Sequence, residues 1–366
     1  MEEPGDRGDG GAPLKLREEA CEPGRVRGAV QGPGEDLGQE GDPVLCMGIN
    51  LDKPDRWKAD IARSVDLYND WFMKFAPNAY RESRAKTARE VGATLKATDN
   101  LRNVKPEILR DSPAVLPTLR MATCPPLARD RLAGLSAVSR TIVNRLDREH
   151  KLPTRISITA LETELKKIGA VIEKLADHDL CTWLQRGSAP TTAELERAST
   201  VIADRLCGAT ADPIIRNAQE SRQLKLIGKW LGARGYKAVV VGSGVKFETM
   251  RAGTYAFHLN VLVLAADGGE RRVNIPVDVA IKPKTSARAF PICIEAKSAG
   301  DFTNVNKRRK EEAQKMRQLR RTYGDRLQYL LFLCGYFDSG YLGYEASEGI
   351  DWVWEHRIDD LARFGL

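Results

Sequence analysis

Three residues near the C-terminal end have types and spacing that could do chemistry. Asp278 lies in an apolar run at residues 273–281, and Glu295 and Lys297 lie in a second run at 291–297. Both runs are short and apolar, which predicts buried strands. Because side chains alternate along a strand, Glu295 and Lys297 should share one face. Burying two carboxylates and an ammonium is costly unless they pair or bind a metal ion.

The chemistry that this group predicts is the hydrolysis of a phosphodiester. That reaction needs charge neutralisation on the scissile phosphate and an activated water molecule. Asp278 and Glu295 are hard oxygen donors suited to Mg²⁺, with the backbone carbonyl of Ala296 as a third ligand. Lys297 would position or deprotonate the attacking water and stabilise the developing charge. A structural ion pair between Glu295 and Lys297 is the alternative, because so short a pattern also occurs by chance.

A further acidic residue could complete the metal shell. Residues 212–233 are predicted to form a helix, and Leu224 lies on its inward stripe. Glu220 falls one turn before Leu224 on the same stripe. An acid that faces a core usually has a partner, so Glu220 is a candidate catalytic residue and metal ligand. The alternative is a half-exposed acid of the first turn, favoured by the helix dipole.

The elements that must position these residues fall into two halves. From about residue 50 to 205, apolar residues recur every three or four positions, which predicts helices. These stripes are Trp57, Ile61, Val65, Tyr68, Phe72 and Phe75; Leu132, Leu135, Val138, Ile142 and Leu146; Leu161, Leu165, Ile168, Ile172 and Leu175; and the stretch 195–206. After Gly208 we expect a helix that starts at Asp212-Pro213 and a long basic helix at 305–323. The predicted strands are 238–241, 257–264, 273–281, 291–296 and 327–334.

The net charge indicates the kind of macromolecular partner, and the scattered cysteines limit the kinds of metal and disulfide site. The chain carries +7 overall, but residues 1–46 carry −6, which leaves +13 on the rest. A basic body favours a polyanionic partner such as DNA or RNA, although a solvated, mildly basic surface is the alternative. Seven cysteines and four histidines are scattered without a CxxC pair, which argues against a disulfide framework and against a zinc or histidine metal site.

These observations predict three segments. Residues 1–46 hold ten of the 31 glycines, so we expect a disordered Gly/Pro/acidic leader, and one hypothesis is that the natural chain starts at Met47. Residues 47–207 are predicted to be a mainly α-helical domain for DNA recognition, dimerisation or both. Residues 208–366 are predicted to be an α/β catalytic domain, a mixed central sheet flanked by helices. Without a signal peptide or a run of ~20 apolar residues, the expected location is the cytoplasm of a prokaryotic cell.

Basic and amide side chains surround the predicted catalytic strands. Residues 307–321 contain eight Lys or Arg and two Glu, and a helix there could present a phosphate-facing edge. The predicted DNA-binding residues are Lys282, Lys284, Arg288, Asn304, Asn306, Lys307, Arg308, Lys315, Arg317 and Arg320. The alternative for the helix is a solvated basic face.

The two strand motifs resemble those of the PD-(D/E)XK nuclease superfamily, and longer stretches resemble the XamI family of type II restriction endonucleases. These stretches are residues 49–61, 119–132, 211–224, 293–313 and 332–361. The resemblance implies a PD-(D/E)XK core and a Mg²⁺-dependent enzyme that cuts double-stranded DNA at a short, palindromic site. It places the metal ligands on Asp278 and Glu295 and the catalytic lysine on Lys297.

One departure from the superfamily pattern leaves open which aspartate is the metal ligand. Pro276 stands two residues before Asp278 rather than directly before it, so Asp267 and Asp301 compete for the role. A palindromic site matches twofold symmetry, so a homodimer is the simplest assembly, with a DNA methyltransferase as genetic partner. A structure- or damage-directed repair nuclease and a non-catalytic DNA-binding protein are the alternatives.

Overall fold

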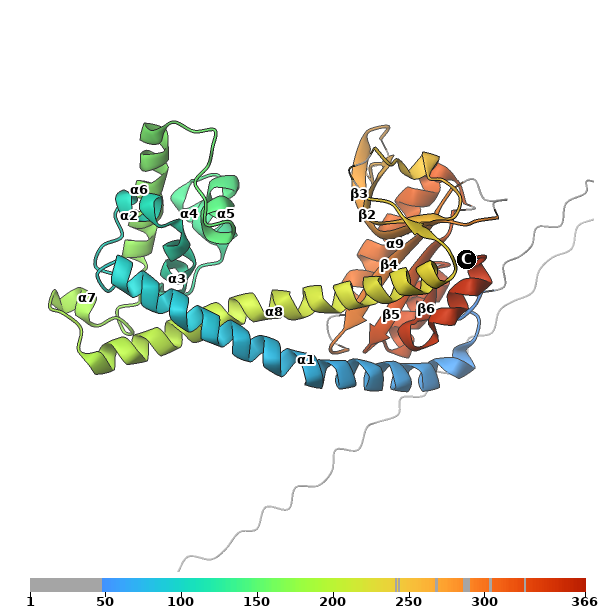
Figure 1. Ribbon diagram of the computed structural model, residues 1–366, viewed down its shortest axis with the longest axis horizontal. Helices are drawn as coiled ribbons and strands as arrows, with labels where there is room; N and C mark the ends of the chain where they lie inside the picture. Colours follow the sequence, from blue (N-terminus) through green and yellow to red (C-terminus); the bar gives the residue numbers. More distant parts are fainter. Residues whose placement is uncertain are drawn as a thin grey trace, which may run out of the picture. The chain divides into compact units, whose positions relative to one another are not determined.

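Two long helices, α1 (Pro54–Ala97) and α8 (Thr192–Ala233), contact each other and join a group of short helices to a mixed sheet (Figure 1). The computed structural model describes residues 48–366, which belong to one compact unit. Not described within this range are residues 241, 243, 267–268, 286–289, 303–304 and 326, and the side chains of 306–308. The predicted leader and Met47 lie outside the described residues.

Short helices pack against the C-terminal half of α1 and the N-terminal part of α8. They are α2 (Pro106–Asp111), η1 (Pro113–Val115), α3 (Leu116–Met121), α4 (Arg129–Ser136), α5 (Arg140–Arg148), α6 (Ile158–Lys174) and α7 (Trp183–Arg186). Their core joins Val91 and Leu95 of α1 to Ile202 and Leu206 of α8. The predicted helix over residues 161–175 is confirmed as α6, and the helical character of this half is confirmed with it.

The apolar stripe from Leu132 to Leu146 belongs to two helices rather than one. Ala137 adopts a left-handed backbone with φ +51°, which ends α4. Ser139 then caps α5 by accepting a hydrogen bond from the Thr141 amide at 3.2 Å. Local cap chemistry therefore overrides the periodic pattern at this point.

The predicted helix start at Asp212-Pro213 is wrong, because α8 runs through both residues without a break. Pro213 removes one backbone donor, which usually weakens a helix interior. Helix α8 also packs against α1, and the Thr87 hydroxyl donates to the Ala203 carbonyl at 3.2 Å from across the helix pair. Helix α8 thus crosses the predicted domain boundary at 207/208, and the separate roles of those two domains stay a prediction.

The second half forms a six-stranded mixed sheet in the order β1-β2-β3-β4-β5-β6. The strands are β1 (Lys237–Ala238), β2 (Thr254–Leu264), β3 (Arg272–Lys282), β4 (Ile292–Ala299), β5 (Tyr329–Gly335) and β6 (Asp351–Trp354). Strands β2, β3 and β4 pair antiparallel, whereas β1 pairs parallel to β2, and β4, β5 and β6 run parallel. The predicted mixed sheet is confirmed, but β6 and the helix before it, α10 (Ser339–Ser347), were not predicted.

Helices cover both faces of the sheet. On one face, α9 (Val305–Tyr323) and α10 pack over Cys293 and Leu331, together with the start of α1. On the other face, the C-terminal half of α8 and the 3₁₀ segment η3 (Glu355–Phe364) pack over Ile294 and Phe332. We call these the α9 face and the α8 face. None of the helices within the described ranges is both long and apolar enough to cross a membrane.

Candidate active site

The site begins where β3 and β4 stop pairing. The last paired residues are Val279 and Ile294, and the next residue on each strand is an acid. There the Asp278 side chain replaces the backbone as acceptor, because its Oδ2 accepts a hydrogen bond from the Ala296 amide at 2.9 Å. The divergence of two strands therefore creates the place where these side chains gather.

Four charged side chains cluster on the α9 face. The Lys297 ammonium lies 3.4 Å from Glu295 Oε2 and 3.6 Å from Oε1 of Glu312, a residue of α9. The Lys315 ammonium, also from α9, donates to Glu295 Oε1 at 2.7 Å. Both carboxylates are buried, Glu295 at 2% exposed and Glu312 at 3%. Two lysines and two glutamates thus neutralise each other in a network rather than in one isolated pair.

The electrostatics of this cluster favour a charged lysine. Burial lowers the pKa of Lys297, but Glu295, Glu312 and Asp278 outweigh that effect, and the pKa lies above its ordinary value. Burial raises the pKa of Glu295, with Asp278 adding to the rise, while Lys297 and Lys315 oppose it. In this arrangement Lys297 is an ammonium at neutral pH, suited to hold an anion or a water molecule rather than to remove a proton.

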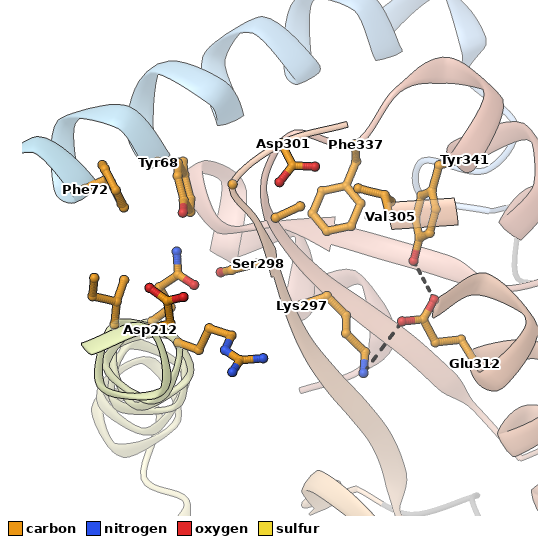
Figure 2. A pocket seen from close by; sticks show the side chains of 15 residues that line it. Tyr68, Phe72, Asp212, Lys297, Ser298, Asp301, Val305, Glu312, Phe337 and Tyr341 are labelled. Atoms are coloured by element: carbon orange, nitrogen blue, oxygen red, sulfur yellow. Dashed lines mark hydrogen bonds and ion pairs between the residues drawn. The ribbon is translucent and has the colours of Figure 1, made fainter. Parts of the chain in front are cut away.

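A cavity of about 550 Å³ opens beside the lysine. Figure 2 shows Lys297 reaching along this cavity to Glu312, which in turn accepts a hydrogen bond from the Tyr341 hydroxyl at 2.7 Å. Tyr68 and Phe72 of α1 face it from the other side (Figure 2). The cluster is therefore buried at its carboxylates but accessible at its ammonium.

A second group of possible ligands forms around Asp278. Glu220 of α8, His258 of β2 and Asp278 each offer one donor atom, and these atoms all lie within 4.8 Å of one another. The imidazole Nδ1 of His258 is 3.7 Å from Glu220 Oε1. Two carboxylates and an imidazole form a donor set that fits a divalent cation.

The structure divides the four predicted catalytic side chains between these two groups. It brings Glu220 together with Asp278, and Glu295 together with Lys297. The carboxylate of Glu295 is engaged by the two lysines, whereas Glu220 approaches from α8. The Ala296 amide is what links the two groups, through its hydrogen bond to Asp278.

Several predicted DNA-binding residues on α9 make contacts within the chain. Lys315 bonds to the Pro276 carbonyl at 2.7 Å as well as to Glu295. Arg317 lies 3.1 Å from Glu348, and Arg320 donates to the Gly349 carbonyl. Contact with DNA by these three side chains stays a prediction.

Near the β3–β4 loop, Lys284 donates to the Arg234 carbonyl, and burial lowers the pKa of Lys282. Outside the described residues lie Arg288, Asn304 and the side chains of Asn306, Lys307 and Arg308. Among the competing aspartates, Asp301 lines the cavity and Asp267 lies outside the described residues.

Sequence reasoning missed Glu312 and His258. Glu312 could have been found, because it shares a helical stripe with Met316 and Leu319, both of which are buried. His258 gave no such signal, because its position opposite Asp278 follows from strand register. The expectation against a histidine metal site considered only residues close together in sequence, whereas Glu220, His258 and Asp278 come together only on folding. Whether His258 binds a metal ion stays a prediction.

Carboxylates and an ammonium gathered beside a cavity suit the hydrolysis of a phosphodiester, the reaction of a nuclease, which needs charge neutralisation and an activated water molecule. The profile of the XamI restriction endonuclease family matches residues 99–354 of this chain. Type II restriction enzyme SalI from Streptomyces albus G is 52% identical over 318 residues, which cover 87% of this chain and 99% of that enzyme. The chain therefore belongs to the XamI restriction endonuclease family, as its sequence motifs predict.

A solved structure of a protein from Vibrio cholerae, VC1899, also matches. It aligns with 78% of this chain and 55% of its own length at 13% identity. The TM-score of that alignment is 0.24, a value too low to support any inference about the fold.

Proposed function

We propose that this restriction endonuclease hydrolyses double-stranded DNA at a short, palindromic sequence and that it requires Mg²⁺ or a related divalent cation. Cleavage of DNA at specific sites, as a type II enzyme, follows from its family and from its similarity to SalI. The cation, the palindrome and the residue roles are the proposal. The observation that carries it is the Lys297 ammonium, held by Glu295 and Glu312 beside Asp278 at the edge of a cavity.

Each side chain has a distinct role in this proposal. Lys297 contacts the attacking water or a phosphate oxygen and stabilises the negative charge that develops in the transition state. Glu295 and Glu312 keep that ammonium charged and fixed. Lys315 keeps Glu295 from repelling the phosphate, because it neutralises the same carboxylate from the side of α9.

Asp278 and Glu220 are the proposed cation ligands, and Glu295 and the Ala296 carbonyl are further candidates. When bound, the cation would supply a Lewis acid for the phosphate and would lower the pKa of a water molecule. The Ala296 amide orients Asp278 for this task, since it fixes one carboxylate oxygen and leaves the other available.

The assembly is also proposed rather than observed. We propose a PD-(D/E)XK core in residues 208–366, base recognition or dimerisation by residues 47–207, and a homodimer on a palindromic site. A DNA methyltransferase that protects the same site would be the genetic partner.

A digest of unmodified plasmid DNA tests this function. Discrete, Mg²⁺-dependent fragments with uniform ends are expected from the wild-type chain. Asp278→Ala and Lys297→Ala should abolish cleavage and leave DNA binding largely intact in gel-shift assays. Nicks or smears would point to a repair nuclease, and full cleavage by either variant would refute the assigned roles.

A further inference from the structure

We propose that His258 is a direct ligand of the divalent cation, with Glu220 and Asp278, and that it makes the site prefer Mn²⁺ or Co²⁺ to Mg²⁺. This inference rests on the proposed function, because it assumes that the cation binds at Asp278. It adds a residue and a cation preference that family membership does not assign.

The backbone of β2 places His258 opposite Asp278. The register pairs Phe257 with Val279 and Leu259 with Val277, so His258 and Asp278 occupy facing positions. His258 has a left-handed backbone with φ +53° in the middle of this strand. A left-handed histidine inside a strand is strained, and such strain is often found at functional sites.

This distortion reverses the sheet face to which each strand turns its side chains. Phe257 packs in the core of the α8 face, yet Leu259, two residues later, packs in the core of the α9 face. Val279 and Val277 show the same change on β3. Regular alternation would keep residues two apart on one face. The change falls at the His258–Asp278 step, where a donor atom of each side chain lies within 4.8 Å of the other.

Helix α8, which covers the α8 face of the sheet, supplies Glu220 as the third ligand. It packs closely on β2, because a side chain at Gly228 would lie 3.2 Å from the Phe257 ring. Two turns earlier on the same helix, Glu220 reaches within 3.7 Å of the His258 imidazole. Three elements that are separate in sequence therefore contribute one donor each.

A simple surface ion pair does not account for this arrangement. The side chains of His258 and Glu220 are 60% and 43% exposed, and an exposed pair of this kind adds little stability. A left-handed backbone costs more than such a pair returns. Binding of a cation would offset the cost of the left-handed backbone, because the cation needs all three donors at once.

The neighbouring cavity offers further polar groups. A space of about 280 Å³ is lined by Glu220, Gln223, Ala296 and Ser298, among others. Gln223 is fully buried, and its Oε1 has no hydrogen-bond partner in the described part of the chain. An unpaired buried acceptor beside Glu220 is a second indication that this edge of α8 faces a ligand.

The imidazole decides which cation the site prefers. Mg²⁺ takes oxygen ligands almost exclusively, whereas imidazole nitrogen suits transition metals. Affinity for a mixed nitrogen and oxygen site rises from Mn²⁺ to Co²⁺. A site with His258 should therefore bind Co²⁺ most tightly of these three, then Mn²⁺, then Mg²⁺.

Binding of MnCl₂ and MgCl₂ to the full chain without DNA, measured by calorimetry, tests the role of His258. His258→Gly removes the imidazole and tolerates the left-handed backbone, so folding is not at risk. We expect this variant to bind Mn²⁺ about 10- to 100-fold more weakly and to lose its preference over Mg²⁺. His150→Gly is the matched control, because His150 is also exposed and left-handed, with φ +50°, but lies in the helical half.

Pulsed electron paramagnetic resonance gives a readout that does not depend on affinity. Bound Mn²⁺ should show coupling to an imidazole nitrogen in the wild-type chain and in His150→Gly, but not in His258→Gly. Unchanged Mn²⁺ binding in His258→Gly, with binding lost in Asp278→Ala, would overturn this inference and leave the proposed cation site standing. Unchanged binding in both variants would overturn the cation site itself.

Discussion

The two halves of the molecule bury charged side chains in different ways. In the helical half, Arg120 and Asp147 form a pair with two contacts, at 2.6 and 3.1 Å, and side chains only 7% and 5% exposed. Arg120 also donates to the Leu127 carbonyl. In the sheet half, Glu295, Lys297 and their α9 partners share charges across a network beside the 550 Å³ cavity.

The difference distinguishes charged side chains that stabilise the fold from charged side chains that remain available to a ligand. The Arg120 donors meet acceptors within the core, so nothing is left for a ligand. Lys297, in contrast, is held at 3.4 and 3.6 Å from its carboxylates and keeps 22% of its side chain exposed. We therefore expect the first pair to set stability and the second cluster to set activity, and substitutions in each half test that contrast.

The largest expected effect is on cleavage by Lys297→Met. Loss of one group that stabilises the transition state should slow cleavage by about 10³-fold. Stability should change less than in Asp147→Asn, because Lys315 still neutralises Glu295 from 2.7 Å and the Tyr341 hydroxyl still donates to Glu312 at 2.7 Å. Single-turnover cleavage and urea unfolding of the same preparation measure both quantities. A large loss of stability would erase the contrast between the two halves.

The opposite pattern is expected for Asp147→Asn. This change leaves the Arg120 guanidinium buried without its counter-charge, which should cost about 3 kcal/mol of unfolding free energy. Cleavage per folded molecule should be unchanged below the melting temperature. Thermal and urea unfolding report the first effect, and a cleavage rate reduced tenfold in fully folded protein would contradict the second.

A smaller effect concerns the dependence of stability on pH. Burial, followed by the charge of Glu312, raises the pKa of Glu345 to about 8. Between pH of about 4.5 and about 8, the folded chain keeps a proton that the unfolded chain releases, so stability falls as pH rises through this window. Glu345→Gln should remove that fall, so its stability relative to wild type should rise between pH 5 and pH 8. Urea midpoints at pH 5 and pH 8 test this, and parallel pH profiles would refute it.

The smallest effect is expected at exposed arginines. Arg317 is 60% exposed and pairs with Glu348, so Arg317→Ala should change stability by less than about 0.5 kcal/mol. If α9 contacts DNA, the salt slope of binding should fall by about 1. Arg140→Ala in the helical half, where an exposed arginine pairs with Asp130 at 2.7 Å, is the matched control. A salt slope for Arg317→Ala equal to that of the wild type would remove Arg317 from the interface.

Sequence alone predicted the parts of the fold that depend on local pattern. Helix α9 has the predicted bounds, and the apolar runs around Asp278 and Glu295 are strands β3 and β4. The roles of these two residues stay predictions, because strand formation does not test chemistry. Periodicity succeeded where one side of an element faces a core and the other faces solvent.

Other features depend on contacts between segments that are far apart in the chain, so they could not be predicted from the local sequence pattern. Proline at position 213 predicts a helix start, yet α8, which packs against α1 and the sheet, runs through it without a break. Strand β6 holds Trp352 and Trp354 fully buried, yet it is four residues long and pairs with β5 alone. The approach of His258 to Glu220 depends on strand register and a left-handed residue, neither of which leaves a periodic pattern.

Because α8 is unbroken, its length sets the rotation of the helical half relative to the sheet half. The helix starts at the Thr191–Glu194 capping box and carries Glu220 about eight turns after its first residue. Each residue added to an α-helix turns the C-terminal remainder by about 100° and advances it by about 1.5 Å. Because Leu224 and Ile227 hold the C-terminal part of α8 on the sheet, a single insertion after Leu206 would turn the helical half by about a quarter of a circle relative to the sheet. Insertions of seven residues, close to two whole turns, would nearly restore the direction of the helical half, so natural variation in the length of α8 should come in such steps.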